Sequence, residues 1–223
     1  MNAGFFKRAL STLIDALLVV AVVYLSFLVL GRTILQNQVD NFDELYGAYE
    51  EISDAYYAEL GILSDQYNAS VELANGDETL KNLAYDTYVA DKAVLDTQYS
   101  IDIEPYNVPI SLYFWTCILY FVIGFIVILS IYTVVLTGKT LGRKIFQVKL
   151  DGPSVNPLSV FFHDIVFKFL FVVLTVMISP YIGVAVLLLT LMIDLIMISM
   201  TPKKTTLRDR LLKMSVVKTG YGY

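Results

Sequence analysis

The chain contains one cysteine, Cys117, and one histidine, His163, in 223 residues. A single cysteine cannot form a disulfide within the chain, and one residue of each type cannot assemble a Cys/His zinc site. A Ser-His-Asp triad would have to use His163, which lies just inside a hydrophobic run without a nucleophile turn beside it. We therefore expect no enzymatic activity, no metal site and no cofactor.

Charged residues are also scarce, at 17% of the chain, whereas 57% is hydrophobic and the mean hydropathy is +0.63. This composition is typical of a small polytopic membrane protein, whose partner is the lipid bilayer. Residues 32–104 contain 16 acidic and 3 basic residues, but residues 203–218 contain 6 basic and 1 acidic. The net charge of −5 thus combines segments on opposite sides of a membrane, and it does not indicate a nucleic-acid partner.

The first hydrophobic helix is predicted over residues 5–30. Its apolar run, residues 9–30, is long enough to cross a bilayer core of about 30 Å, and it is longer than the core of a cleaved signal peptide. Arg8 starts this helix and Asp15 lies inside it, on the same face. Because a carboxylate in a membrane helix costs at least about 2.5 kcal/mol, we expect Asp15 to face a partner or water.

The acidic residues 36–104 have helical periodicity. Apolar and aromatic side chains recur every three or four residues from Phe42 to Tyr67, and a looser pattern continues to Tyr99 after a turn at Asn75-Gly76-Asp77. The pattern predicts an extracytoplasmic antiparallel helical hairpin, similar to a coiled coil, with a tyrosine-rich seam and an acidic outer face. Packing is favoured over ligand binding as the role of the tyrosines.

A second span is predicted after the hairpin. Pro105 and Pro109 are expected to end the hairpin helix, and residues 110–136, which carry no charge, are expected to cross the membrane. The small residues Gly124 and Ser130 would allow another helix to pack closely against this span.

Residues 158–200 are too long for one span. Ser179-Pro180 divides them, so we expect two helices, 158–179 and 182–200. Four spans place both termini in the cytoplasm, in agreement with the basic residues at each end. The expected fold is an all-α integral membrane protein of the cell (cytoplasmic) membrane with four transmembrane helices. Its regions are 1–35, the first transmembrane helix; 36–105, the extracytoplasmic hairpin; and 106–223, helices 2–4 with a short, basic amphipathic cytoplasmic loop and tail.

The two halves of the chain resemble each other. Phe5-Phe6-Lys7-Arg8 opens the first span and Phe161-Phe162-His163-Asp164 opens the third, while residues 139–146 and 205–212 follow the second and fourth. Each half therefore reads as two membrane helices and a basic amphipathic segment, which is a parallel repeat. The first of these segments suits the anionic inner leaflet, and a short strand over residues 147–150 is the alternative.

Four ionisable residues lie inside the predicted spans: Asp15, Asp164, Lys168 and Asp194. Asp15 and Asp194 are six residues from the inner boundary and Lys168 is seven, so all three are about 10 Å deep. Asp164 and Lys168 are also an i, i+4 pair. One interpretation is a structural polar clamp between helices. The other is an ion or proton pathway, since carboxylates with a lysine can bind a cation or relay protons.

Several motifs together resemble the RDD family of membrane proteins. They are Arg8-x6-Asp15, the Gly-Lys-Thr-Leu-Gly-Arg-Lys segment at 138–144, and Thr-Leu-Arg-Asp at 206–209 ahead of Val216-Val217. The family is named after one arginine and two aspartates, which correspond here to Arg8, Asp15 and Asp209. The resemblance covers about residues 1–30 and 110–218; the acidic hairpin departs from the usual short loop, and position 208 is arginine where histidine is frequent.

The resemblance implies a bacterial or archaeal inner-membrane protein with a role in transport. One functional hypothesis is therefore a small transporter or cation/proton pathway, working as a homo-oligomer because four helices enclose little interior. The alternative is a non-transporting membrane adaptor or sensor whose hairpin binds a protein partner. In either case, we expect Asp209 to bond the backbone near Arg8 or to pair with Arg8 itself.

Overall fold

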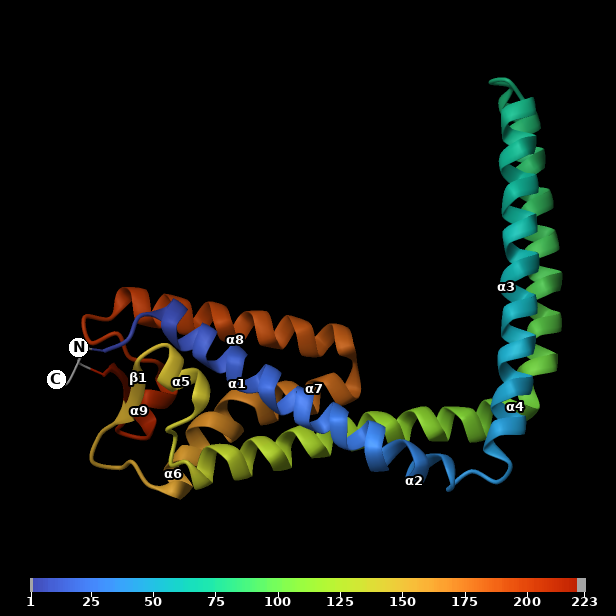
Figure 1. Ribbon diagram of the computed structural model, residues 1–223. Helices are drawn as coiled ribbons and strands as arrows, with labels where there is room; N and C mark the ends of the chain where they lie inside the picture. Colours follow the sequence, from blue (N-terminus) through green and yellow to red (C-terminus); the bar gives the residue numbers. More distant parts are fainter. Residues whose placement is uncertain (1, 220–223) are drawn as a thin grey trace. The chain divides into compact units, whose positions relative to one another are not determined.

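The computed structural model describes residues 2–219 (Figure 1). It forms two compact units: one contains the described residues up to Gly31 and from Ile118 onward, and the other contains Arg32–Cys117. The elements in chain order are α1 (Phe5–Ser26), the π-helix η1 (Phe27–Gly31), α2 (Arg32–Gln36), α3 (Phe42–Leu73), α4 (Glu78–Val135), α5 (Leu141–Ile145), β1 (Val148–Asp151), α6 (Pro157–Phe161), the π-helix η2 (Phe162–Leu170), α7 (Phe171–Ile178), α8 (Pro180–Met200), α9 (Leu207–Leu211) and β2 (Ser215–Lys218).

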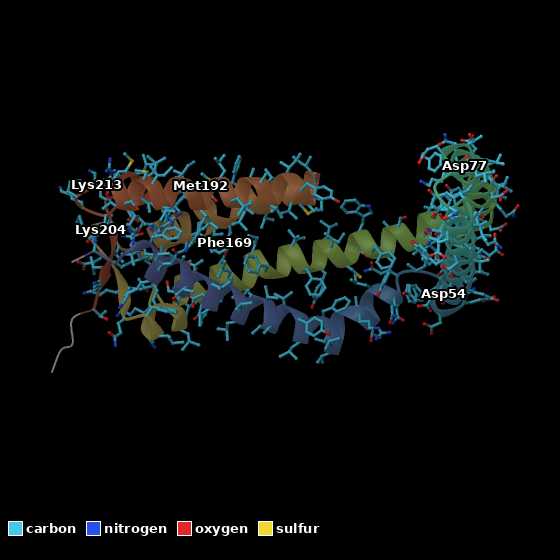
Figure 2. All side chains as sticks on the ribbon, turned by 90° about the horizontal axis from the view of Figure 1, so that it is seen from above. Asp54, Asp77, Phe169, Met192, Lys204 and Lys213 are labelled. Carbon is cyan, nitrogen blue, oxygen red and sulfur yellow. The ribbon has the colours of Figure 1, made fainter. Side chains whose placement is uncertain are left out.

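Four helical stretches are long and apolar enough to cross a membrane, in agreement with the four predicted spans. They are Phe5–Gln36, Glu78–Val135, Pro157–Ile178 and Pro180–Met200. The last two are separated where Ser179 adopts an extended backbone and Pro180 begins α8, a position that proline tolerates because its missing N–H would be unbonded there. Outward-facing side chains on α8, such as Met192, are exposed and apolar (Figure 2). The protein is therefore a multi-pass membrane protein.

The expectation that Pro105 and Pro109 end the hairpin helix is wrong, since α4 continues through both prolines. A proline inside a helix costs about 3 kcal/mol, because it lacks an N–H and its ring crowds the preceding turn. Buried side chains before and after the two prolines oppose this cost: Ile103 is 4% exposed and Ile110, directly after Pro109, is 2% exposed. Packing therefore holds the helix together where local preference would break it.

The second unit contains the predicted helical hairpin. α3 and the first part of α4 are joined at Asn75 and Gly76, which both have positive φ angles, 44° and 92°. The tyrosine seam is present: the rings of Tyr56 and Tyr99 stack with centroids 4.3 Å apart. The Tyr56 hydroxyl also donates a 2.7 Å hydrogen bond to Asp96. These tyrosines thus pack the two helices together.

In the first unit, helices α1, α4 and η2 share an apolar core formed by Val19, Val23, Leu129 and Ile165. Gly124 of α4 is the point of close approach expected from the sequence, because a Cβ atom there would lie 3.1 Å from Val23. Ser130 does not serve this purpose through its side chain, which donates to Ile126 in its own helix.

One end of the helix bundle is closed by a small folded cap made of α5, β1, α9 and β2 (Figure 1). β1 and β2 pair antiparallel, with Leu150 opposite Val216. The backbone N–H of Ala3 donates to Val216, so the start of the chain joins the same sheet. The buried core of the cap comprises Ala3, Val148, Leu150, Val160, Met214 and Val216. This sheet corrects the all-α expectation and confirms the alternative of a strand near residues 147–150.

The internal repeat is visible in the fold. Thr140 precedes α5 and Thr206 precedes α9; both helices contain five residues, and each is followed by a strand. The two strands then pair with each other in antiparallel orientation, as a two-fold relation between the halves requires. The similar segments of the sequence therefore have similar structures.

Candidate functional site

Arg8 and Asp209 form a buried ion pair between the start of α1 and α9. The guanidinium Nη1 lies 2.5 Å from Asp209 Oδ2, and the two side chains are 7% and 0% exposed. Three further N–H groups of Arg8 donate to backbone carbonyls, those of Ala3, Lys204 and Val216. Arginine suits this position because its planar guanidinium can donate in several directions at once. The expected pairing of Asp209 with Arg8 is confirmed.

Asp209 is positioned by the local sequence of α9. Its carboxylate accepts a hydrogen bond from the backbone N–H of Thr206, and the Thr206 hydroxyl accepts one from the backbone N–H of Asp209. This reciprocal arrangement is a capping box. Burial raises the pKa of Asp209, but the hydrogen bond to His163 and the Arg8 charge outweigh it and hold the pKa well below its usual range.

His163 lies between two carboxylates. Its Nε2 is 2.9 Å from Asp209 Oδ1, and its Nδ1 is 2.8 Å from Asp164 Oδ1. A neutral imidazole has only one N–H, whereas ionised carboxylates can only accept hydrogen bonds. Both contacts are therefore hydrogen bonds only when the imidazole carries two protons or when one of the carboxyl groups is protonated.

Arg143 of α5 completes this arrangement. Its Nη2 lies 2.6 and 2.8 Å from the two carboxylate oxygens of Asp164, and its Nη1 donates to the carbonyl of Gly138. Arg143 and Asp164 are 6% and 4% exposed. We call the five connected side chains the charge network: Arg8, Asp209, His163, Asp164 and Arg143. The network joins α1, α9, η2 and α5.

The two ion pairs of the charge network are reciprocal across the repeat. Arg8 and Asp164 occupy equivalent positions in the first and third spans, and Arg143 and Asp209 are each the third residue of a five-residue helix. Each pair joins the membrane helix of one half to the short helix of the other. The first half supplies both arginines and the second supplies both aspartates, so the network holds the two halves together.

Asp15 belongs to a separate set of contacts. Its Oδ1 accepts from the Tyr132 hydroxyl at 3.0 Å and the Gly142 N–H at 2.8 Å, and its Oδ2 accepts from Thr140 at 2.5 Å. α5 can approach this closely because residue 142 is glycine: a Cβ atom there would lie 2.0 Å from the Ser11 carbonyl oxygen. Neutral donors thus attach α5 to α1 through a buried carboxylate.

The other predicted site residues have different partners. Asp194 pairs with Arg208 at 2.6 Å, while Lys168 donates to the Thr12 hydroxyl. The expected pair of Asp164 with Lys168 is absent from the contacts of residues 2–219, since Asp164 bonds Arg143 and His163. Both residues lie in the π-helix η2, and each is already occupied by a partner from another element: Arg143 of α5 for Asp164 and Thr12 of α1 for Lys168.

Three important residues were not identified as site residues from the sequence. The sequence patterns single out His163 only as a candidate for a catalytic triad, place Arg143 in a segment at the membrane surface, and give Tyr132 no role. The repeat contains a signal for one of them, because it aligns Arg143 with Asp209. Within residues 2–219, the His, Cys, Asp and Glu side chains form no group of three that could hold a metal ion.

Comparisons with known proteins identify the family of this chain. The sequence model described as the RDD family matches residues 2–213, which include the hairpin as well as the membrane helices. No curated protein and no solved structure match the chain. Arg8, Asp15 and Asp209, the residues that the motif comparison selected, are 7%, 7% and 1% exposed. The chain belongs to the RDD family.

Proposed function

We propose that this RDD protein is a small transporter in which buried ionisable groups couple proton or cation movement to the contact between its two halves. The observation that carries the proposal is the position of His163 between Asp164 and Asp209. A set of three side chains that must share an additional proton for both contacts to be hydrogen bonds is a natural element of a proton-coupled mechanism.

The contact between the halves depends on the proton held in the charge network. When its ring carries two N–H groups, His163 donates to Asp164 on its own helix, η2, and to Asp209 on α9. Loss of one proton leaves a ring nitrogen lone pair facing a carboxylate oxygen, which is repulsive. Proton release would therefore weaken the attachment of α9 and favour a second arrangement of the halves.

Asp15 is the better candidate for direct cation binding. Its hydrogen-bond donors, Tyr132, Thr140 and Gly142, are all neutral, and no ion pair to Asp15 occurs among the described residues. Asp194, in contrast, is already neutralised by Arg208 at 2.6 Å. Lys168 and Asp164 would tune the local charge rather than carry the ion.

Flux measurements in proteoliposomes test this function. We would compare the wild type with His163→Gln, Asp15→Asn and Asp194→Asn under proton, sodium and potassium gradients. Wild-type flux that His163→Gln or Asp15→Asn removes, with the fold intact, supports the proposal. Asp54→Asn, on the exposed surface of the hairpin, is the matched control and should leave flux unchanged. Absence of flux above empty vesicles for every gradient would refute the proposal.

The proposed topology places both termini and the cap in the cytoplasm and the hairpin outside. Its support is the charge distribution, since residues 32–104 are strongly acidic and the cap and tail are basic. A single cysteine introduced at Asp54 in a Cys117→Ser background should react with a membrane-impermeant maleimide in intact cells. A cysteine at Lys149 should react only after the cells are opened.

A second candidate function is a membrane adaptor or sensor. The hairpin favours it, because Tyr57 and Tyr85 are 65% and 56% exposed, and a protein partner could cover them. Replacing residues 36–104 by a short Gly-Ser linker distinguishes the two candidates. The replacement should preserve flux in a transporter and abolish the cellular function of an adaptor. A homo-oligomer is part of the transporter proposal and is checked by the mass of the protein in detergent.

A further inference from the structure

The two short helices of the cap expose large apolar side chains on the face opposite their buried charges. In both helices the exposed residues are the first and the fifth, which share one face of a helix. Their exposed fractions are 43% for Leu141, 54% for Ile145, 56% for Leu207 and 60% for Leu211. The buried face of each helix is occupied by Arg143 or Asp209, so the charges point inward and the hydrocarbon points outward.

The same helices and the segments next to them in the chain carry exposed basic residues. In residues 139–151 and 203–218, the exposed basic residues are Lys139, Lys144, Lys149, Lys203, Lys204, Arg210, Lys213 and Lys218. The exposed acidic residue in these two segments is Asp151. Lys204 and Lys213 project at this end of the bundle in Figure 2. Lys144 and Arg210 are equivalent in the repeat, since each is the fourth residue of its helix.

The position of α5 identifies what lies against this surface. Gly142 touches the backbone of Ser11, so α5 runs beside the first turns of the membrane helix α1. Phe6 and Phe162, which begin the first and third spans at equivalent positions, are 75% and 39% exposed at the same end. Segments that lie in the membrane interface typically combine aromatic rings at the start of a span with exposed apolar residues and lysines.

We propose that α5 and α9 form a paired binding surface for anionic phospholipids in the leaflet that contains the cap. The exposed apolar side chains enter the upper acyl region of the leaflet; they are those of Leu141, Ile145, Leu207 and Leu211. The lipid phosphate groups are bound by Lys144 and Arg210. This surface does not depend on transport. It has a structural consequence, however, because lipid bound to α5 and α9 stabilises the same two helices that hold Arg143 and Asp209 in the charge network.

Lipid titration tests the basic part of this surface. Phosphatidylglycerol is added to the purified full-length protein in neutral detergent, and bound lipid is counted by native mass spectrometry with phosphatidylcholine as the reference lipid. Lys144→Gln with Arg210→Gln should weaken phosphatidylglycerol binding by roughly 10- to 30-fold, because each basic residue near an anionic surface contributes about a fivefold change in affinity. The control Arg32→Gln with Lys81→Gln makes the same charge change outside the cap and should have no effect.

Equal binding of the two lipids by the wild type, or an equal loss in the control, would overturn the proposal. A second measurement tests the apolar part without depending on the basic variants. A fluorophore is attached to a single cysteine at position 145 or 211 in a Cys117→Ser background. The labelled protein is then reconstituted with lipids that are brominated on the acyl chains. Strong quenching is expected at both positions but not at position 149; quenching as weak as at position 149 would place α5 and α9 in water and refute lipid binding.

Discussion

Arg8 and Asp209 stand 201 positions apart in the chain and form an ion pair 2.5 Å long at the start of the first membrane helix. Arg143 and Asp164 form the equivalent pair. In this pair the first half supplies the short helix and the second half supplies the membrane helix, the reverse of the first pair. His163 connects the two pairs through its two ring nitrogens. The two halves are thus held together by opposite charges that neither half could neutralise alone.

A double-mutant cycle should detect this pairing. Arg8→Ala should lower the free energy of unfolding by about 3–5 kcal/mol, because it leaves the Asp209 carboxylate buried without its main cation. Asp209→Ala should be costly for the same reason, and the double variant should lose much less than the sum. Thermal unfolding in detergent measures all four proteins. Strict additivity would show that the two side chains do not interact, and Arg210→Ala, on the exposed face of α9, should change stability by less than about 0.5 kcal/mol.

Asp209 should also make stability depend on pH in the acid range. Because its pKa is lower in the folded protein than in the unfolded chain, the unfolded chain binds a proton at a higher pH. The stabilisation is therefore fully present above about pH 5, the upper limit of the titration of an ordinary aspartate, and decreases as the pH falls toward the folded pKa. The melting temperature of the wild type should fall between pH 5 and 3 more steeply than that of Asp209→Asn. Parallel curves for the two proteins would contradict this assignment.

The membrane helices, the hairpin and the repeat are predictable from the sequence, because they depend on the length of apolar runs, on helical periodicity and on similar segments in the two halves. The helix break at Ser179-Pro180 follows from the backbone limits of proline, and the structure has it. The same rule failed at Pro105 and Pro109, where Ile103 and Ile110 are buried and tertiary packing outweighs the local cost. A rule about local conformation cannot supply that comparison.

The charge network was only partly predictable. The pairing of Arg8 with Asp209 followed from the family motif, but depth counting placed Lys168 in a cluster with the buried carboxylates. In the structure, Lys168 bonds Thr12, its equivalent position in the other half. Counting residues from a span boundary gives the depth of a side chain but not its direction around the helix, so it does not identify the neighbouring helix that the side chain faces. The partner of each buried charge therefore depends on the packing of the helices, which residue patterns do not specify.

Tyr132 should contribute to stability through Asp15. Tyr132→Phe removes one of three donors to a buried carboxylate, which we expect to cost about 1–3 kcal/mol. The Tyr132 hydroxyl also accepts the backbone N–H of Leu141 at 2.6 Å, so the variant should loosen the start of α5. Thermal unfolding and hydrogen exchange of the Leu141 amide measure the two effects. Tyr181→Phe is the control, since that side chain is 88% exposed and should leave both quantities unchanged; an unaffected Leu141 amide in Tyr132→Phe would contradict the expected coupling.

Gly142 should be the most sensitive glycine of the cap. A Cβ atom at this position would lie 2.0 Å from the carbonyl oxygen of Ser11 and 3.0 Å from Cγ of Asp15, and the first neighbour is backbone that cannot rotate away. Gly142→Ala should therefore push α5 away from α1 and break the hydrogen bond from the residue 142 N–H to Asp15. We expect the free energy of unfolding to fall by roughly 2–4 kcal/mol, because the contact is overpacked and the buried Asp15 carboxylate loses a donor. Gly47→Ala is the matched control: it lies in α3 with nothing within 4 Å of the added atom, so the better helix propensity of alanine should make that variant slightly more stable. Thermal unfolding and limited proteolysis after Lys139 and Lys144 compare the two variants, and α5 should become cleavable only in Gly142→Ala. Equal melting temperatures and equal protection of α5 would show that the contact between α5 and α1 does not depend on a glycine at position 142.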